Sequence, residues 1–295
     1  MWKTSLLKQA AEIFREQGFE TFYINPLQRD FIAHTDVQDL TKRFIETLSE
    51  AVGVAQLKLA SLAIYVVREL LTRWRRRKIA VLIDNVFQAI GLDKAETYVK
   101  ELLGLIEHPP ASYDNIVVIV ATSEGATRER IGRHRWAILR PMWNMSREGF
   151  EQLYRQIPGP KPSFEEVWRI TGGNPGMLAK LYKAKWSVDE VIKSITTSRD
   201  LDTFILSLSA EERKWLLEAV ENPDTLPAKE KLPLMQKLIE LNLIISSIIY
   251  RDLELWIDQP PPQKDLELGI GKHIAWQTPL HREAVRKALQ EASTA

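Results

Sequence analysis

The sequence predicts an α/β fold with a parallel sheet, followed by a smaller domain of helices and a hairpin. Two apolar runs of strand length, residues 79–84 (IAVLID) and 115–123 (NIVVIVATS), lack polar alternation and end in polar side chains. Such runs are typical of strands that are buried on both faces of a parallel sheet. Helical patterns separate these runs, as they do in α/β proteins. After Trp186, three helical patterns and a hairpin follow in the order of a winged helix.

The elements of the first part can be placed by their periodicity. Residues 4–17 repeat apolar side chains at helical spacing, and Gly18 follows as a C-cap glycine would. Residues 19–25 (FETFYIN) alternate over a strand length before Pro26. Further helices are expected over 37–50, 55–77, 92–107, 146–156, 163–170 and 175–183, and a short strand over 136–140 (WAILR). This alternation predicts a doubly wound sheet whose ligand lies at the carboxyl ends of the strands.

The composition changes after Trp186. Helices are expected over 187–208, 210–221 and 231–242, and strands over 243–250 and 273–278, with a proline-rich and charged loop at 258–264 between the strands. Residues 200–295 carry 11 Lys and Arg against 16 Asp and Glu, a net charge of −5. Because phosphate contacts dominate affinity for DNA, an acidic winged helix favours contact with a protein, or autoinhibition, over DNA binding.

The composition also excludes several classes of protein. With 45% hydrophobic and 27% charged residues the chain can bury a core, and a net charge of +1 argues against a globally basic nucleic-acid-binding protein. The absence of cysteine excludes thiolate metal sites, and the 5 histidines show no metal-binding spacing. No run approaches the ~18 apolar residues of a membrane helix, and no signal-peptide pattern opens the sequence. We therefore expect a cytoplasmic protein that has no membrane partner.

Three short stretches suggest phosphate chemistry. The opening MWKTSLLKQA runs like the second half of the phosphate-binding loop G-x-x-x-x-G-K-[ST] and the start of its helix. In such a loop the lysine reaches the phosphates and the hydroxyl coordinates Mg²⁺, which fits Lys3 and Thr4. The start of an ordinary helix can have the same sequence, so the assignment to a phosphate-binding loop depends on the rest of the chain. Asp84 ends the first apolar run, where a Mg²⁺-organising acid is expected, and Thr122 and Ser123 end the next run, where a γ-phosphate sensor would lie.

Together these stretches resemble the archaeal ATPases of the STAND class, which are P-loop NTPases related to AAA+ proteins. The resemblance is carried by KTSLLKQA, IAVLIDN, IVVIVATS, GRHRWAILRPMWNMSREGF and TGGNPGML, which follow in the family's order over residues 3–183. It implies a P-loop (AAA+/RecA-like) α/β domain over residues 1–145, a helical lid over 146–198 and a C-terminal winged-helix domain over 199–295.

The resemblance also implies ATP and Mg²⁺ as ligands and assigns roles to particular residues. Asp84 and Asn85 take the catalytic positions, and Thr4 and Asp84 the metal. Arg133 is equally well a solvated surface arginine. The implied nucleotide-binding residues are Lys3, Thr4, Ser5, Thr122, Ser123, Arg133 and Pro175.

Three departures from the family pattern bear on hydrolysis. The family's strand and glycines before the lysine are missing, Trp2 stands at the last loop glycine, and Asn85 follows Asp84 where hydrolytic members place a second acid. An indole at a site of close backbone approach obstructs the β-phosphate, and an amide cannot accept a proton from water. We therefore expect weak ATP binding and weak or lost hydrolysis. A truncated start, a rearranged degenerate ATPase and a strand supplied by a partner all remain open as explanations.

The leading interpretation is an ATP-binding regulatory switch with a protein partner at its winged helix. The alternatives are a nucleic-acid-binding winged-helix protein and a pseudo-ATPase scaffold subunit of a complex. The nucleic-acid alternative also draws on residues 73–78 (RWRRRK), which interleave an aromatic side chain with positive charge. Cations are equally typical of a helix C-terminus, where they complement the helix dipole, and we favour that interpretation.

Overall fold

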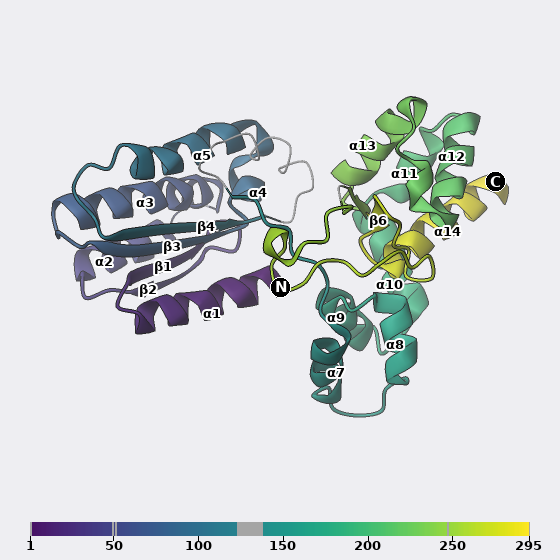
Figure 1. The fold of residues 1–295 in the computed structure, drawn as a ribbon, viewed down its shortest axis with the longest axis horizontal. Helices are drawn as coiled ribbons and strands as arrows, with labels where there is room; N and C mark the ends of the chain where they lie inside the picture. Colours follow the sequence, from purple (N-terminus) through teal and green to yellow (C-terminus); the bar gives the residue numbers. More distant parts are fainter. Residues whose placement is uncertain (1, 49, 51, 123–137, 247, 295) are drawn as a thin grey trace. The chain divides into compact units, whose positions relative to one another are not determined.

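The computed structural model describes residues 2–48, 50, 52–122, 138–246 and 248–294 of the chain. The chain divides into two compact units, Met1–Leu139 and Arg140–Ala295. In Figure 1 the first unit runs from purple to blue and the second from teal to yellow.

The first unit is built on a four-stranded sheet with the strand order β2-β1-β3-β4. Its strands are β1 (Glu20–Asn25), β2 (Asp30–His34), β3 (Lys78–Asp84) and β4 (Asn115–Ala121). β1 pairs in parallel with β3, and β3 pairs in parallel with β4, whereas β2 pairs antiparallel with β1. The predicted α/β fold is confirmed, with a sheet that is mostly but not entirely parallel. The antiparallel β2 was not predicted; it returns after a turn at Pro26 in which Asn25 Oδ1 accepts from the backbone N–H of Gln28 at 3.0 Å.

Helices cover both faces of this sheet (Figure 1). They are α1 (Trp2–Glu16), α2 (Gln38–Leu48), α3 (Val52–Thr72), α4 (Val86–Ile90) and α5 (Leu92–Glu107). Successive side chains of a strand point to opposite faces. Ile79, Val81 and Ile83 of β3 pack with α2, α3 and α5, whereas Ala80 and Leu82 pack with α1. Both faces of β3 are therefore buried, which explains its unbroken apolar run.

The basic stretch at residues 73–78 follows α3 instead of forming its last turn. The helix ends at Thr72, and Arg75 adopts a left-handed conformation with φ of 51°. The prediction of a helix to residue 77 was wrong at this end. Three of the four arginines in this stretch pair with acids: Arg73 with Asp39 and Glu69, Arg76 with Glu20 and Asp36, and Arg77 with Asp114. These ion pairs support a structural role for the stretch.

The second unit is mainly helical, with a two-stranded sheet. Its helices are α7 (Arg147–Arg155), α8 (Phe164–Thr171), α9 (Pro175–Lys183), α10 (Val188–Ser198), α11 (Leu201–Leu206), α12 (Ala210–Glu221), α13 (Leu232–Glu240) and α14 (Pro279–Thr294), with short 3₁₀ turns at Pro223–Thr225, Lys229–Lys231 and Leu253–Leu255. Local sequence sets several of the starts. Ser163 and Ser209 form capping boxes with Glu166 and Glu212, and Pro175 occupies the first turn of α9.

One core joins helices α9 to α14 of the second unit. It includes Leu181 of α9, Ile195 of α10, Leu216 of α12 and Ala288 of α14. Trp276 lies in the same core, and its indole Nε1 donates to the carbonyl of Ala219 at 3.1 Å. Helices α9 and α10 of the expected lid therefore share a core with the C-terminal residues, whereas Phe150 of α7 and Val167 of α8 form a separate cluster with Leu178 of α9. The division into domains at 145/146 and 198/199 stays a prediction.

Residues 140–145 also belong to the second unit. Met142 forms an isolated bridge with Ile257, and Gln259 Nε2 donates to the carbonyl of Asn144 at 3.0 Å. Of the strand predicted over 136–140, residues 136 and 137 lie outside the described residues, and residues 138–140 form no strand.

The hairpin of the second unit is shorter than predicted. Strands β5 (Ile244–Ile245) and β6 (Ala275–Trp276) pair antiparallel over two residues each. Side chains hold the long connection between them: Asp224 accepts from the backbone N–H groups of Lys272 and His273 at 2.7 and 2.8 Å. The backbone N–H of Ile248 also donates to the carbonyl of His273 at 3.2 Å. The winged-helix assignment stays a prediction.

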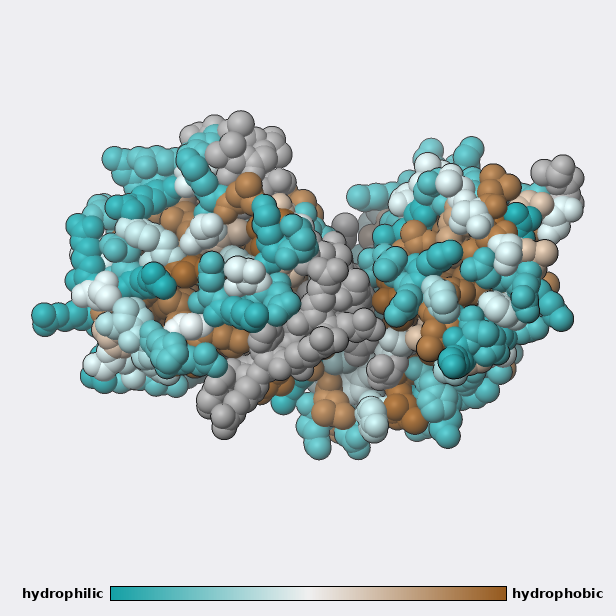
Figure 2. All heavy atoms as spheres, turned by 90° about the horizontal axis from the view of Figure 1, so that it is seen from above, coloured by the Kyte–Doolittle hydropathy of each residue, from teal (hydrophilic) through white to brown (hydrophobic). Residues whose placement is uncertain are grey.

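Hydrophilic side chains are interspersed with small hydrophobic areas on the face drawn in Figure 2. None of the helices within the described ranges is both long enough and apolar enough to span a membrane.

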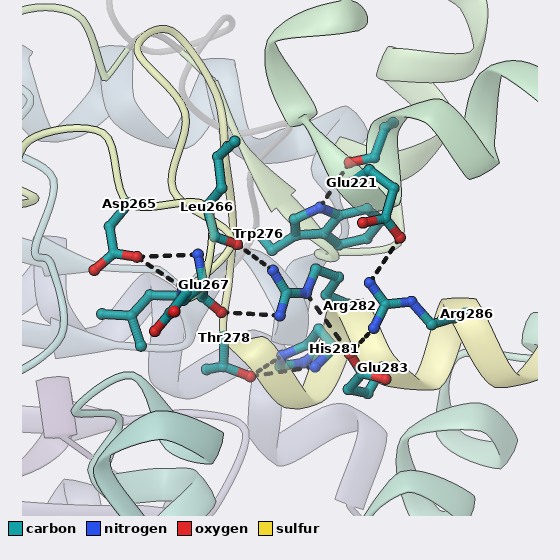
Figure 3. A network of polar contacts seen from close by, with 12 residues as sticks. Glu221, Asp265, Leu266, Glu267, Trp276, Thr278, His281, Arg282, Glu283 and Arg286 are labelled. Atoms are coloured by element: carbon teal, nitrogen blue, oxygen red, sulfur yellow. Dashed lines mark hydrogen bonds and ion pairs between the residues drawn. The ribbon is translucent and has the colours of Figure 1, made fainter. Parts of the chain in front are cut away.

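A neutral histidine is buried in the first turn of α14 (Figure 3). His281 is 6% exposed, and its Nδ1 lies 2.8 Å from the hydroxyl oxygen of Thr278. That oxygen also accepts from the backbone N–H of His281 at 3.3 Å. Burial lowers the pKa of His281 to about 3, and the positive charges of Arg199 and Lys180 act in the same direction. The folded protein therefore keeps this imidazole uncharged.

Replacing His281 with Asn is expected to remove part of the acid sensitivity of the fold. In the unfolded chain a histidine protonates below its ordinary pKa of 6.5, whereas the folded chain holds it neutral to about pH 3. The unfolded state thus binds more protons as the pH falls, so this contribution to stability is complete above pH 6.5 and is lost below it. In urea unfolding, the stability difference between wild type and His281→Asn should fall by about 1.4 kcal/mol per pH unit between about pH 6 and 4. A difference that does not change with pH would contradict this.

Candidate functional site

The candidate site lies at the carboxyl edge of the sheet in the first unit. In the parallel register Ile24 is paired with Ile83, and Asp84 with Ala121. Asn25, Asp84 and Thr122 therefore end or follow three neighbouring strands on one edge. The first turn of α1 brings Lys3 and Thr4 to the same edge, since both contact residues there.

Asp84 is the centre of the site. It is 2% exposed, and three side chains donate to its Oδ2 atom. The hydroxyl of Thr4 lies at 2.5 Å, the amide Nδ2 of Asn25 at 3.2 Å and the hydroxyl of Tyr23 at 3.3 Å. A buried carboxylate is costly unless hydrogen bonds replace the lost water. The donors from α1 and β1 supply these bonds and hold the acid in place.

Tyr23 acts as a donor in this group at any physiological pH. Its side chain is fully buried, and burial raises its pKa to about 12. The hydrogen bond from Asn25 lowers this pKa, and the negative charge of Asp84 raises it further. The phenol therefore stays protonated beside the carboxylate.

Lys3 is held at the end of the neighbouring strand. Its Nζ atom donates to the backbone carbonyl of Thr122 at 2.5 Å. Thr122 follows β4, and Asn85 follows β3, where its backbone N–H donates to the carbonyl of Ala121 at 3.1 Å. Asn85 has a φ of 53° at the N-cap of α4, a left-handed conformation that asparagine tolerates well. Its side chain makes no capping bond.

The arrangement suits a phosphate ligand that brings a magnesium ion. Carboxylate and hydroxyl oxygens are ligands of Mg²⁺, which is usually held by one or two protein groups together with substrate phosphates and water. Thr4 and Asp84 provide one oxygen of each kind. In the parts of the chain that the structure describes, no group of three or more His, Cys, Asp or Glu could hold a metal alone. The donor set therefore fits Mg²⁺ that arrives with a nucleotide and does not form a protein-only metal centre.

The structure brings together four of the predicted residues: Lys3, Thr4, Asp84 and Thr122. Asn85 adjoins them along the chain. Ser5 is exposed on α1, and Trp2 begins that helix. Ser123 and Arg133 lie outside the described residues. Pro175 begins α9 in the second unit, and its predicted place near the adenine stays a prediction.

Sequence reasoning missed Tyr23 and Asn25. Both lie on β1, on the strand face that also carries the contacts to Asp84. The signal was present in FETFYIN, because Asn25 is a polar residue at the carboxyl end of a strand, like Asp84 and Thr122. Asn25 could have been found by considering the polar residue at the carboxyl end of each of the three strands.

A comparison with known families agrees with this geometry. The model of an ATPase domain that occurs predominantly in Archaea matches residues 2–181, which include Lys3, Thr4, Asp84 and Thr122. Among curated proteins, none matches the chain. Membership of this family indicates a nucleotide-binding, ATPase-like function, and ATP and Mg²⁺ are the ligands it implies. The chain belongs to the family of ATPase domains found predominantly in Archaea.

Proposed function

We propose that the chain is an ATP-binding regulatory switch of the STAND type that binds Mg·ATP at the carboxyl edge of its first sheet and hydrolyses it slowly. One observation carries this proposal: the Thr4 hydroxyl lies 2.5 Å from the buried carboxylate of Asp84. In P-loop NTPases, the hydroxyl of the phosphate-binding loop and an aspartate at the end of a neighbouring strand together hold the Mg²⁺ ion. Mg²⁺, when bound with ATP, neutralises charge on the phosphate oxygens.

The residues of the chain have distinct parts in this proposal. Lys3 would contact the β- and γ-phosphates in place of the Thr122 carbonyl, and Thr122 or Ser123 would take the position that senses the γ-phosphate. Thr4 and Asp84 would hold the metal. Ser5, Arg133 and Pro175 remain proposed nucleotide contacts that carry less of the argument.

The switch would report its nucleotide state to a protein partner through the proposed winged helix. The negative charge of residues 200–295 supports a protein partner, since 16 acids outnumber 11 bases there. The alternative of nucleic-acid binding through residues 73–78 has less support, because Arg73, Arg76 and Arg77 are ion-paired with acids.

Asn85 makes slow hydrolysis part of the proposal. An amide can orient the attacking water but cannot accept its proton. A cycle limited by release of bound nucleotide suits a switch, and complete loss of turnover would instead suit a pseudo-ATPase scaffold.

Nucleotide binding should depend on Lys3 and Asp84. Hydrogen bonds to charged groups are worth about 1.5–3 kcal/mol, so we expect Lys3→Ala to weaken ATP binding by roughly 10- to 100-fold. Asp84→Asn is expected to abolish the gain in affinity that Mg²⁺ provides. The matched control is Asp114→Asn, because Asp114 precedes β4 at the opposite end of the strand and pairs with Arg77 on the surface. Titration calorimetry with ATP, with and without Mg²⁺, measures these effects; equal affinities in all variants would contradict the proposal.

Turnover should respond to a carboxylate at position 85. General-base assistance is typically worth about 10²–10⁴ in rate, so Asn85→Glu is expected to accelerate ATP hydrolysis at least roughly tenfold. Asn85→Gln is the matched control, since glutamine has the same length as glutamate and the same backbone strain at a φ of 53° but carries no charge. Phosphate release under saturating Mg·ATP is the measurement. An equal rate in the two variants, with ATP affinity retained, would show that the base lies elsewhere.

A further inference from the structure

Tyr23 has no role in the proposed function, yet it lies directly against the proposed metal ligand. It occupies the middle of β1, and its hydroxyl lies 3.3 Å from Asp84 Oδ2. The amide Nδ2 of Asn25 lies 3.4 Å from the same hydroxyl. Because that amide nitrogen can only donate, the phenol oxygen accepts from Asn25, and its own proton is directed to Asp84.

The ring of Tyr23 is also held from the surface. Lys8 Nζ lies 5.1 Å from the ring centroid and 2.7 Å from Asp30 Oδ2. Lys8 follows Thr4 by four residues on α1, so the two side chains lie on the same face of that helix. The pair formed by Lys8 and Asp30 thus covers the ring beside the turn of α1 that carries Thr4.

Hydrogen bonds fix the orientation of the Asp84 carboxylate. The last side-chain torsion of aspartate is broad and has no strong intrinsic preference. The bonds from Thr4, Asn25 and Tyr23 all end on Oδ2. They fix one oxygen toward β1 and α1, and within the part of the chain that the structure describes they leave the other oxygen, Oδ1, for a further ligand.

We propose that Tyr23 is a positioning residue of the Mg²⁺ site, which holds Oδ2 of Asp84 so that the carboxylate keeps the orientation required by the metal of bound Mg·ATP. This inference rests on the proposed function. Tyr23 acts through Asp84 and makes no contact with the nucleotide. Its loss should therefore weaken the use of Mg²⁺ without changing how ATP binds in the absence of metal.

The test compares Tyr23→Phe with Tyr98→Phe. Tyr98 is the matched control, because it is a buried tyrosine of the same unit whose hydroxyl donates to the carbonyl of Ala60 at 2.8 Å. Each variant loses one buried hydroxyl, but only Tyr23 contacts Asp84. The readout is the Mg²⁺ concentration that gives half of the metal-dependent gain in ATP affinity. Mutation of a residue that hydrogen-bonds a metal ligand typically lowers metal affinity by about 10–100-fold. We therefore expect this Mg²⁺ concentration to rise about tenfold for Tyr23→Phe and less than about twofold for Tyr98→Phe.

The outcomes separate this inference from the proposed function. If wild type gains affinity with Mg²⁺ and the two variants behave alike, the positioning role is overturned and the proposed function stands. If wild type shows no metal-dependent gain, both fall. If Tyr23→Phe does not fold, wild-type protein labelled with ¹³C at the tyrosine Cζ replaces it. Adding Mg²⁺ to the ATP complex should then shift the Tyr23 signal and leave that of Tyr98 in place, and an unmoved Tyr23 signal would overturn the role.

Discussion

The parallel pairing of β1, β3 and β4 is the constraint on which the candidate site depends. Parallel strands end at the same edge of a sheet, so three polar residues that are far apart in the sequence become neighbours: Asn25, Asp84 and Thr122. The site requires this register, since a shift of one residue in β3 would turn Asp84 to the opposite face of the sheet, away from Thr4 and Tyr23. The packing of Ala80 and Leu82 against α1 also brings the first turn of that helix to the edge. Burial in the sheet and the geometry of the site therefore have the same cause.

The second constraint is the cost of burying a carboxylate. Asp84 is 2% exposed and is not part of any ion pair seen among the described residues, so hydrogen bonds from neutral side chains and a hydroxyl must stabilise its charge. Tyr23 and Asn25 meet this need from β1, and Thr4 from α1. A cation that arrives with a phosphate ligand would add positive charge beside this carboxylate. The same donors thus stabilise the fold and prepare the acid for a metal.

Much of the first unit could be predicted because short stretches of the sequence indicate its strands and their polar ends. The runs predicted at 79–84 and 115–123 correspond to β3 and β4, of which β4 ends at Ala121, and their polar ends identify Asp84 and Thr122. Lys3 and Thr4 were recognised as the end of the motif G-x-x-x-x-G-K-[ST], which is local in sequence. Tyr23 was missed because an aromatic residue inside an alternating strand looks like core, and only the tertiary pairing places its hydroxyl on Asp84. β2 was missed because its sequence, DFIAH, is short and has little alternation.

The second unit was harder to predict in detail. Serine caps and Pro175 mark helix starts in the sequence, so α8, α9 and α12 were expected within a few residues. The length of the hairpin strands was overestimated, because the apolar runs at 243–250 and 273–278 have the pattern of buried strands. In the fold, Asp224 and Arg251 bind the backbone of the connection instead, through contacts between residues far apart in the sequence. No local pattern encodes such contacts.

The central claim is that a nucleotide and its metal bind at the carboxyl edge of the first sheet. The most direct measurement replaces Mg²⁺ with paramagnetic Mn²⁺ in the ATP complex and records the backbone amide signals of the first unit by NMR. The two ends of a seven-residue strand such as β3 lie about 20 Å apart, so the edges are distinguishable. The account predicts strong broadening at Asn25, Asp84 and Thr122 and much weaker broadening at the opposite ends, Glu20, Lys78 and Asn115. Broadening at the opposite ends, or at neither, would contradict it.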